Sequence, residues 1–107
     1  MQELLDNIER DSGLPIYLVQ RHDNEMNCCV LNFNQTQVVG DGVEIEHKLY
    51  DFYFVLILDG KLMSTIDKFQ EVLKTYVFHD VTVNAIAPLE SNHKSAYQVS
   101  ITATKLL

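Results

Sequence analysis

"LYDFYFVLILDG", residues 49–60, is the strongest β-strand signal in the chain. Side chains of a strand alternate between its two faces. One face would carry Tyr50, Phe52, Phe54, Leu56 and Leu58, and the other would carry Leu49, Tyr53, Val55 and Ile57. Both faces are apolar, whereas a strand in a small antiparallel sheet usually turns one face to water. The sequence therefore predicts that something covers the second face as well.

A helix signal follows this strand. Asp59 and Gly60 are turn residues that end the strand, and from Ser64 onward the apolar period lengthens to that of a helix. The apolar stripe consists of Leu62, Ile66, Phe69, Leu73, Tyr76 and Val77. Ser64 and Asp67 have the spacing of a capping box at a helix N-terminus. The pattern predicts a helix over about residues 65–77.

The N-terminal half mixes helix and strand signals. Residues 2–12 place their apolar side chains on one helical face and end before Gly13, which predicts a short amphipathic helix. Residues 15–21 and 28–34 are rich in β-favouring side chains and are separated by a polar turn, so we expect them to pair as a hairpin. For residues 35–48 we expect a long loop or an extended β-arm.

The C-terminal third returns to the period of a strand. Within residues 81–87 we expect one face to carry Val81, Val83, Ala85 and Ala87. The closing segment, residues 96–107, should turn inward Tyr97, Val99, Ile101 and Ala103. Together these segments predict an α+β fold, a mainly antiparallel sheet of about four to five strands with two helices on one face. Residues 1–107 are expected to form a single domain.

The composition argues against several classes of partner. The formal net charge is −7, and the eight Lys and Arg residues are scattered, which opposes binding to nucleic acid or to an anionic membrane. The longest apolar run, residues 52–58, is far shorter than the roughly 20 residues that cross a bilayer. The charged N-terminus is unlike a signal peptide. We expect a protein made and kept in a cytosol, without specific nucleic-acid or membrane binding.

Residue types that carry chemistry are dispersed. The four histidines lie in separate loops or strand ends, and the two adjacent His-Asp pairs would point apart on an extended chain. Motifs for acyl, phosphoryl or hydride transfer are missing. Cys28 and Cys29 are neighbours, which predicts two reduced thiols, one packed inward and one not. We therefore expect no enzyme: no catalytic residue, no metal ligand and no cofactor.

The order of these segments, above all in residues 49–107, resembles that of the tail terminator (tail-completion or minor tail) proteins of long-tailed bacteriophages. The likeness consists of an amphipathic N-terminal helix, a β-hairpin, an arm, the strand "YDFYFVLILDG", the helix "STIDKFQEVLKTYV", the strand "VTVNAIA", a polar loop and the closing strand "AYQVSITATKLL". That family has no invariant catalytic motif, so the resemblance lies in the arrangement of elements.

The resemblance implies a subunit that closes into a six-membered ring, caps the tail tube, ends its polymerisation and forms the head–tail joining surface. The implied partners are other copies of the chain, the tail tube protein and the head–tail connector protein. The implied location is the virion tail, assembled in the cytoplasm of the bacterial host. A ring would also cover the second apolar face, and each large side chain so buried contributes about 1.5 to 3 kcal/mol. The predicted subunit-interface residues are Tyr50, Tyr53, Val55 and Ile57, and the predicted contact residues of the arm are Asp41, Val43, Glu44, Ile45 and Glu46.

Three other hypotheses stay open. A small acidic binding or inhibitor domain would dock its arm or an edge strand on another protein and expose a patch around Tyr50 or Tyr53. A metal-dependent enzyme would gather dispersed carboxylates, with Asp41, Glu44 and Glu46 among the candidates, and its melting temperature would respond to Mg, Mn or Ca. Lastly, the two helices and a folded-back arm would cover both faces of the long strand within one monomer.

Overall fold

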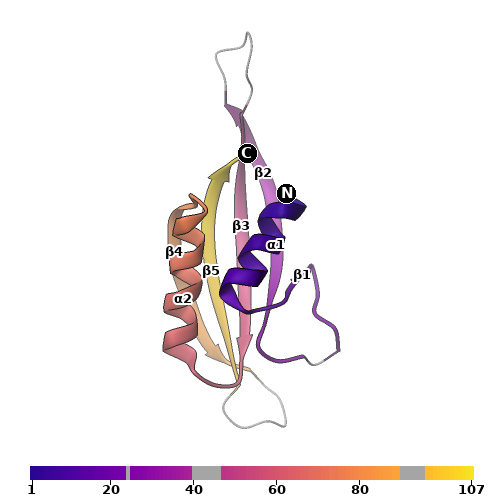
Figure 1. Cartoon of the computed structure of the whole chain (residues 1–107), viewed down its shortest axis with the longest axis vertical. Helices are drawn as coiled ribbons and strands as arrows, with labels where there is room; N and C mark the ends of the chain where they lie inside the picture. The colour runs from indigo at the N-terminus through magenta and orange to yellow at the C-terminus, as the bar shows by residue number, and fades with distance from the viewer. Residues whose placement is uncertain (24, 40–46, 90–95) are drawn as a thin grey trace.

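The computed structural model describes residues 1–23, 25–39, 47–89 and 96–107. Within these residues the chain forms two helices and one five-stranded, mostly antiparallel sheet (Figure 1). In chain order the elements are α1 (Gln2–Ser12), β1 (Ile16–Leu18), β2 (Cys28–Val39), β3 (His47–Leu58), α2 (Leu62–Thr75), β4 (His79–Pro88) and β5 (Tyr97–Leu106). The strands lie side by side in the order β1-β2-β3-β5-β4, so β3 is central. The predicted α+β fold is confirmed.

Both helices lie on the same face of the sheet, as predicted (Figure 1). The opening stretch of the sequence supplies the middle of the core on this face through Phe52, Phe54, Leu56 and Leu58. The ring of Phe54 meets that of Phe69 in α2 with centroids 5.2 Å apart, and the ring of Phe52 meets that of Phe78 at 5.0 Å, both edge to face. The helices therefore cover one of the two apolar faces of β3.

α1 begins and ends where the sequence predicts. Leu5 and Ile8 are buried in the core, which is why this short helix is stable on the sheet. Gly13 follows the helix with a φ of 77°, a left-handed conformation that favours glycine, and its N–H donates to the carbonyl of Glu9.

α2 begins and ends earlier than the predicted residues 65–77. The predicted capping box is wrong, because Ser64 lies inside the first turn and its hydroxyl donates to the carbonyl of Lys61 at 3.2 Å. Leu62 packs against the core, so apolar contact places the start of the helix before the serine. At the other end, Val77 has a φ of 62°, which cannot continue a helix.

The predicted hairpin of the first two strands is also wrong. β1 is shorter than predicted and runs parallel to β2, with Ile16 opposite Cys29. The chain leaves the sheet at Val19, whose φ is 72°, and a polar segment returns it to the beginning of β2 (Figure 1). Because that segment is long enough to run back along the strand, it allows a parallel pairing that a tight turn would forbid.

β2 and β3 form a long antiparallel pair that includes half of the predicted arm. Of residues 35–48, the structure places 35–39 in β2 and 47–48 in β3, with an irregularity in register between Gln35 and Gln37. Of the two expected structures, an extended arm and a long loop, the extended one is therefore correct for these positions. The predicted arm contacts at residues 41–46 lie outside the described residues.

β4 departs from the alternation that the sequence predicts. Val83 lies opposite Ile101 and Ala85 lies opposite Ser100. β4 therefore has one residue more than β5 between these two pairs, and this extra residue, Asn84, forms a bulge. An extra residue moves every later side chain to the other face. The prediction that Ala85 and Ala87 share a face with Val83 is therefore wrong. β5 keeps its predicted alternation, since Val99, Ile101 and Ala103 are buried in the core.

Candidate assembly surface

The sheet face opposite the helices carries no helix of the described chain. Strand register sets its side chains in rows across the sheet. From the arm end, the rows contain Leu49 and Leu106; Asn34, Asp51, Thr104 and His79; Asn32, Tyr53, Thr102 and Thr82; Val30, Val55, Ser100 and Ala85; and Cys28, Ile57, Gln98 and Ala87. We call these residues the open face. The two helices do not cover both faces within a monomer, because both lie on the other side. The cover expected from a folded-back arm falls in part on residues 40–46, which lie outside the described residues.

The apolar part of the open face is smaller than the sequence predicts. Tyr53 is 40% exposed, Val55 is half-buried and Ile57 is only 6% exposed. Around them the rows carry amide and hydroxyl side chains, with Asp51 and His79 in one row and no Lys or Arg. Cross-strand neighbours alone bury much of a residue at the centre of a sheet. Tyr53 and Leu106, which is 46% exposed, are therefore the large apolar side chains that this face offers to another molecule.

The segment between β1 and β2 covers the lower end of the open face. Cys28, beside Ile57 in register, is fully buried, and its thiol donates to the backbone oxygen of Glu25 at 3.5 Å. The Arg21 guanidinium donates to the same oxygen at 2.7 Å. The Glu25 carboxylate beside the Tyr17 hydroxyl, together with burial, raises the pKa of Tyr17 to about 12. The segment between β1 and β2 thus covers part of the second apolar face of β3, which the sequence analysis did not predict.

Tyr50 is not brought together with the other predicted interface residues. It lies on the helix side of β3, where its ring meets those of Phe33 and Phe52 at centroid distances of 5.9 Å and 6.2 Å. Tyr53, Val55 and Ile57 do share one face. Alternation along the strand already separates Tyr50 from these three.

A shallow depression of about 330 Å³ lies beside Tyr53. Its lining residues are Asp51, Tyr53, Asp80, Thr82, Thr102, Ala103 and Thr104. Its lining holds two carboxylates and three threonine hydroxyls, and His79 is next to Asp80 in the chain and opposite Thr104 in register. Within the described ranges, no three His, Cys, Asp or Glu side chains gather as a metal ion would require.

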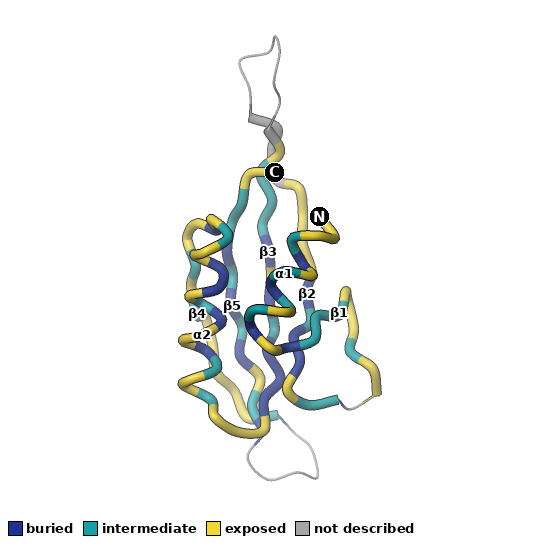
Figure 2. The backbone as a smooth tube through the Cα atoms, in the orientation of Figure 1, coloured by how far each residue is buried: buried dark blue, intermediate teal, exposed yellow. Residues whose placement is uncertain are grey.

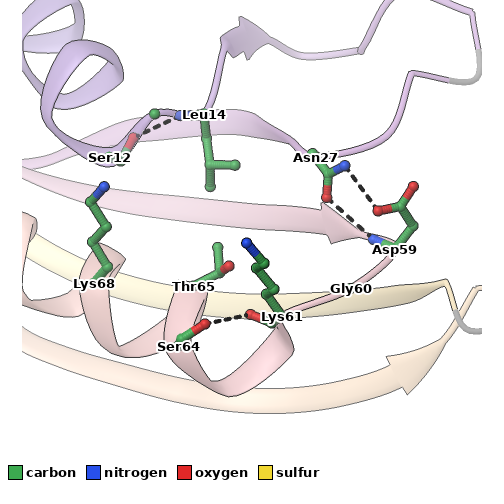
Figure 3. Close-up of a pocket in the computed structure, with 10 residues that line it drawn as sticks. Ser12, Leu14, Asn27, Asp59, Gly60, Lys61, Ser64, Thr65 and Lys68 are labelled. Carbon is green, nitrogen blue, oxygen red and sulfur yellow. Dashed lines mark hydrogen bonds between the residues drawn. The ribbon is translucent and has the colours of Figure 1, made fainter.

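A wider groove of about 680 Å³ lies on the helix side, between the end of α1 and the start of α2 (Figure 3). Its polar groups mostly bond to one another. The Asn27 amide donates to the Asp59 carboxylate at 2.9 Å, and the Asp59 N–H donates back to the Asn27 side-chain oxygen at 3.4 Å. Lys61 and Lys68 are exposed. These bonds tie the start of β2 to the end of β3, which is a structural role.

The two cysteines differ from the prediction that only one is packed inward. Both are free and fully buried, Cys29 in the core and Cys28 beneath the segment before β2. Burial raises the pKa of each thiol above its ordinary value. Because the thiolate is the reactive form, both thiols are protonated and inert at neutral pH.

No protein-family model matches the chain, and no curated protein matches it either. None of the helices in the described part of the chain is long and apolar enough to cross a membrane. The function is therefore argued from the residues and their arrangement.

Proposed function

We propose that this chain is a structural subunit of a phage or prophage tail: a tail terminator that caps the tail tube, ends its polymerisation and forms the head–tail joining surface. The observation that carries the proposal is the order of elements. The chain runs helix, two strands, a long strand, helix and two strands, which is the order on which the resemblance to terminators rests. The parallel pairing of β1 with β2 departs from that pattern, and part of the expected arm lies within β2 and β3.

The open face supports this proposal by its charge. Its rows carry no Lys or Arg, and the chain as a whole has a formal net charge of −7. A surface of amides and hydroxyls without cations has no means of neutralising phosphates, so it does not hold DNA. Such a face suits the lumen of a ring through which DNA slides.

The partners of the proposed terminator are other copies of the chain in a ring of six, the tail tube protein and the head–tail connector protein. Tyr53 and Val55 are its predicted contact residues that retain exposed surface. Ile57 and Tyr50 contribute to the fold of the subunit instead, since Ile57 is buried and Tyr50 packs on the core side.

The test is deletion of the gene in the phage or prophage that carries it, followed by negative-stain imaging of the particles. Without a terminator, nothing stops the addition of tube subunits, so we expect overlong tubes without heads. Complementation with the wild-type gene should restore tails of uniform length joined to heads. Normal tails in the deletion strain would rule out the proposed function.

A second candidate function is a small acidic binding domain. The exposure of Tyr53 beside the depression at Asp51 and Asp80 favours it, because an exposed aromatic residue next to polar groups is typical of a docking site. This candidate predicts a monomer or dimer rather than a ring, so the mass of the particle in solution separates the two functions.

A further inference from the structure

The sheet ends on both sides in strand edges that have no partner among the described residues. β4 pairs with β5 alone, and the structure shows it exposed along most of its length (Figure 2). On the other side, β1 pairs with β2 only from Cys29 to Leu31. Residues 32–39 of β2 extend beyond that contact and keep an outer edge without a described strand beside it.

Neither edge carries a charge or a proline along its middle, and in β4 Asp80 and Pro88 lie at the ends of the strand. Native proteins protect exposed edges with lysines, other charges, prolines or bulges. Residues 32–39 and residues 81–87 contain no charged residue and no proline. Register shifts interrupt both edges, between His79 and Thr82 and between Val83 and Ala85 in β4, and between Gln35 and Gln37 in β2. The outer backbone groups of β4 stay unpaired in the described chain. Two edges without charge along their middle are compatible with a sheet that continues into a neighbour.

The directions of the two strands are compatible with such a continuation. β2 is antiparallel to β3, β3 to β5, and β5 to β4, so β2 and β4 run in opposite directions. A rotation about an axis roughly along the strands preserves these directions. It therefore brings β4 of one copy antiparallel to β2 of the next, with the helices of both copies on the same side.

The position of β1 fixes where the neighbour binds. Because β1 occupies the edge beside Cys29 and Leu31, the neighbouring β4 is displaced along the sheet toward Val39. Strands that tilt relative to a closed ring or barrel have such a stagger between neighbours. β1 acts as a stop that sets the register of the contact.

We propose that β4 of one copy of this chain pairs antiparallel with residues 32–39 of β2 in the next copy, so that the sheets form one continuous ring. This inference rests on the proposed function for one point, the assembly of copies of the chain into a ring. It adds which strands make the contact between the copies. The open faces of all copies then form one surface, and Tyr53 lines that surface instead of lying between subunits.

The first experiment blocks the edge with charge. Ala87→Lys places a lysine on exposed β4, and Gln98→Lys is the matched control, because Gln98 is exposed, lies opposite Ala87 in register and is on the inner strand β5. We expect Ala87→Lys to raise the concentration for half-assembly by at least about tenfold. Gln98→Lys should leave it within about twofold. Equal effects of the two variants would overturn the inference.

The second experiment joins the proposed neighbours covalently. Asn34→Cys and Ala87→Cys put thiols on the exposed open-face side of the two edges, and the buried native thiols do not compete. With a short bismaleimide, the double variant should give a ladder of linked species up to the full ring, whereas each single variant should give no ladder. Tyr53→Cys is the control for contact through the open face. If two open faces met, this variant would be linked into pairs only.

The outcomes separate the contact from the function. Assembly of the wild-type chain by light scattering, with pairs linked through Tyr53→Cys and no ladder from the double variant, would overturn the edge contact and leave the ring. A wild-type chain that stays monomeric would overturn both. A ladder that stops at dimers in the double variant would contradict a closed ring.

Discussion

The two faces of β3 are equally apolar in sequence and differ in what covers them. Phe52 and Phe54 are completely buried beneath two helices, whereas Tyr53, between them in the chain, is 40% exposed. The Phe rings pack against the rings of Phe69 and Phe78, while Tyr53 lies in a row with amide and hydroxyl side chains. Alternation thus shows which residues share a face, and the neighbouring strands decide whether that face is a core.

The largest expected effect comes from placing a charge on the helix side. Phe52→Asp would bury a carboxylate with no partner, so we expect a loss of more than about 4 kcal/mol and no folded state. Circular dichroism and thermal melting measure this. Phe52→Leu is the control and should stay folded. A folded Phe52→Asp protein would show that this face is not the core.

A smaller effect is expected at the covered end of the open face. Ile57→Ala removes buried methyl groups beside Cys28 and should cost about 2 to 4 kcal/mol in the free energy of unfolding. Urea denaturation measures this loss. If Ile57→Ala costs no more than a surface substitution, the segment before β2 does not cover this end of the sheet.

Tyr53→Asp should have a much smaller effect on folding than Phe52→Asp. Its side chain is partly exposed and its neighbours are polar, so we expect a change of about 1 kcal/mol or less and a native circular dichroism spectrum. Unfolding of both Asp variants would mean that the two faces are equally internal, and the distinction between core and assembly surface would fail.

The smallest expected effect concerns the helix layer alone. The Asp11 carboxylate accepts hydrogen bonds from Arg10 and from the Tyr76 hydroxyl, which lower its pKa below the ordinary 3.8. A lowered folded-state pKa gives stability that is present above the ordinary value and is lost as the pH falls through the folded value. We expect Asp11→Asn to flatten the decrease in melting temperature below about pH 4, and Tyr76→Phe to flatten it in part. An unchanged slope in Asp11→Asn would contradict a folded-state contact.

The parts of the fold that follow from local chemistry are predictable from the sequence. Residues 2–12 form a helix because they carry an apolar stripe that ends before Gly13, and β5 alternates because polar residues occupy every second position from Gln98 to Thr104. The parts of the fold that depend on long-range strand pairing cannot be predicted in this way. The parallel pairing of β1 depends on the left-handed turn at Val19, and the bulge at Asn84 reverses a simple alternation in β4. Neither residue signals this by type.

The candidate site was predictable to a similar extent. Tyr53, Val55 and Ile57 follow from the period of a strand, whereas the loop that covers Ile57 and Cys28 depends on where β1 pairs. The absence of charge in residues 81–87 is visible in the sequence. It gains meaning only when the strand order makes β4 an edge.

The most direct test of the proposed ring is the mass of the purified wild-type chain, measured by light scattering over a wide range of concentrations. If copies assemble into the proposed ring, the mass approaches six times the 12.3 kDa of one chain and stays there. A mass that remains at 12.3 kDa up to the highest concentration would contradict the ring, and with it the proposed function.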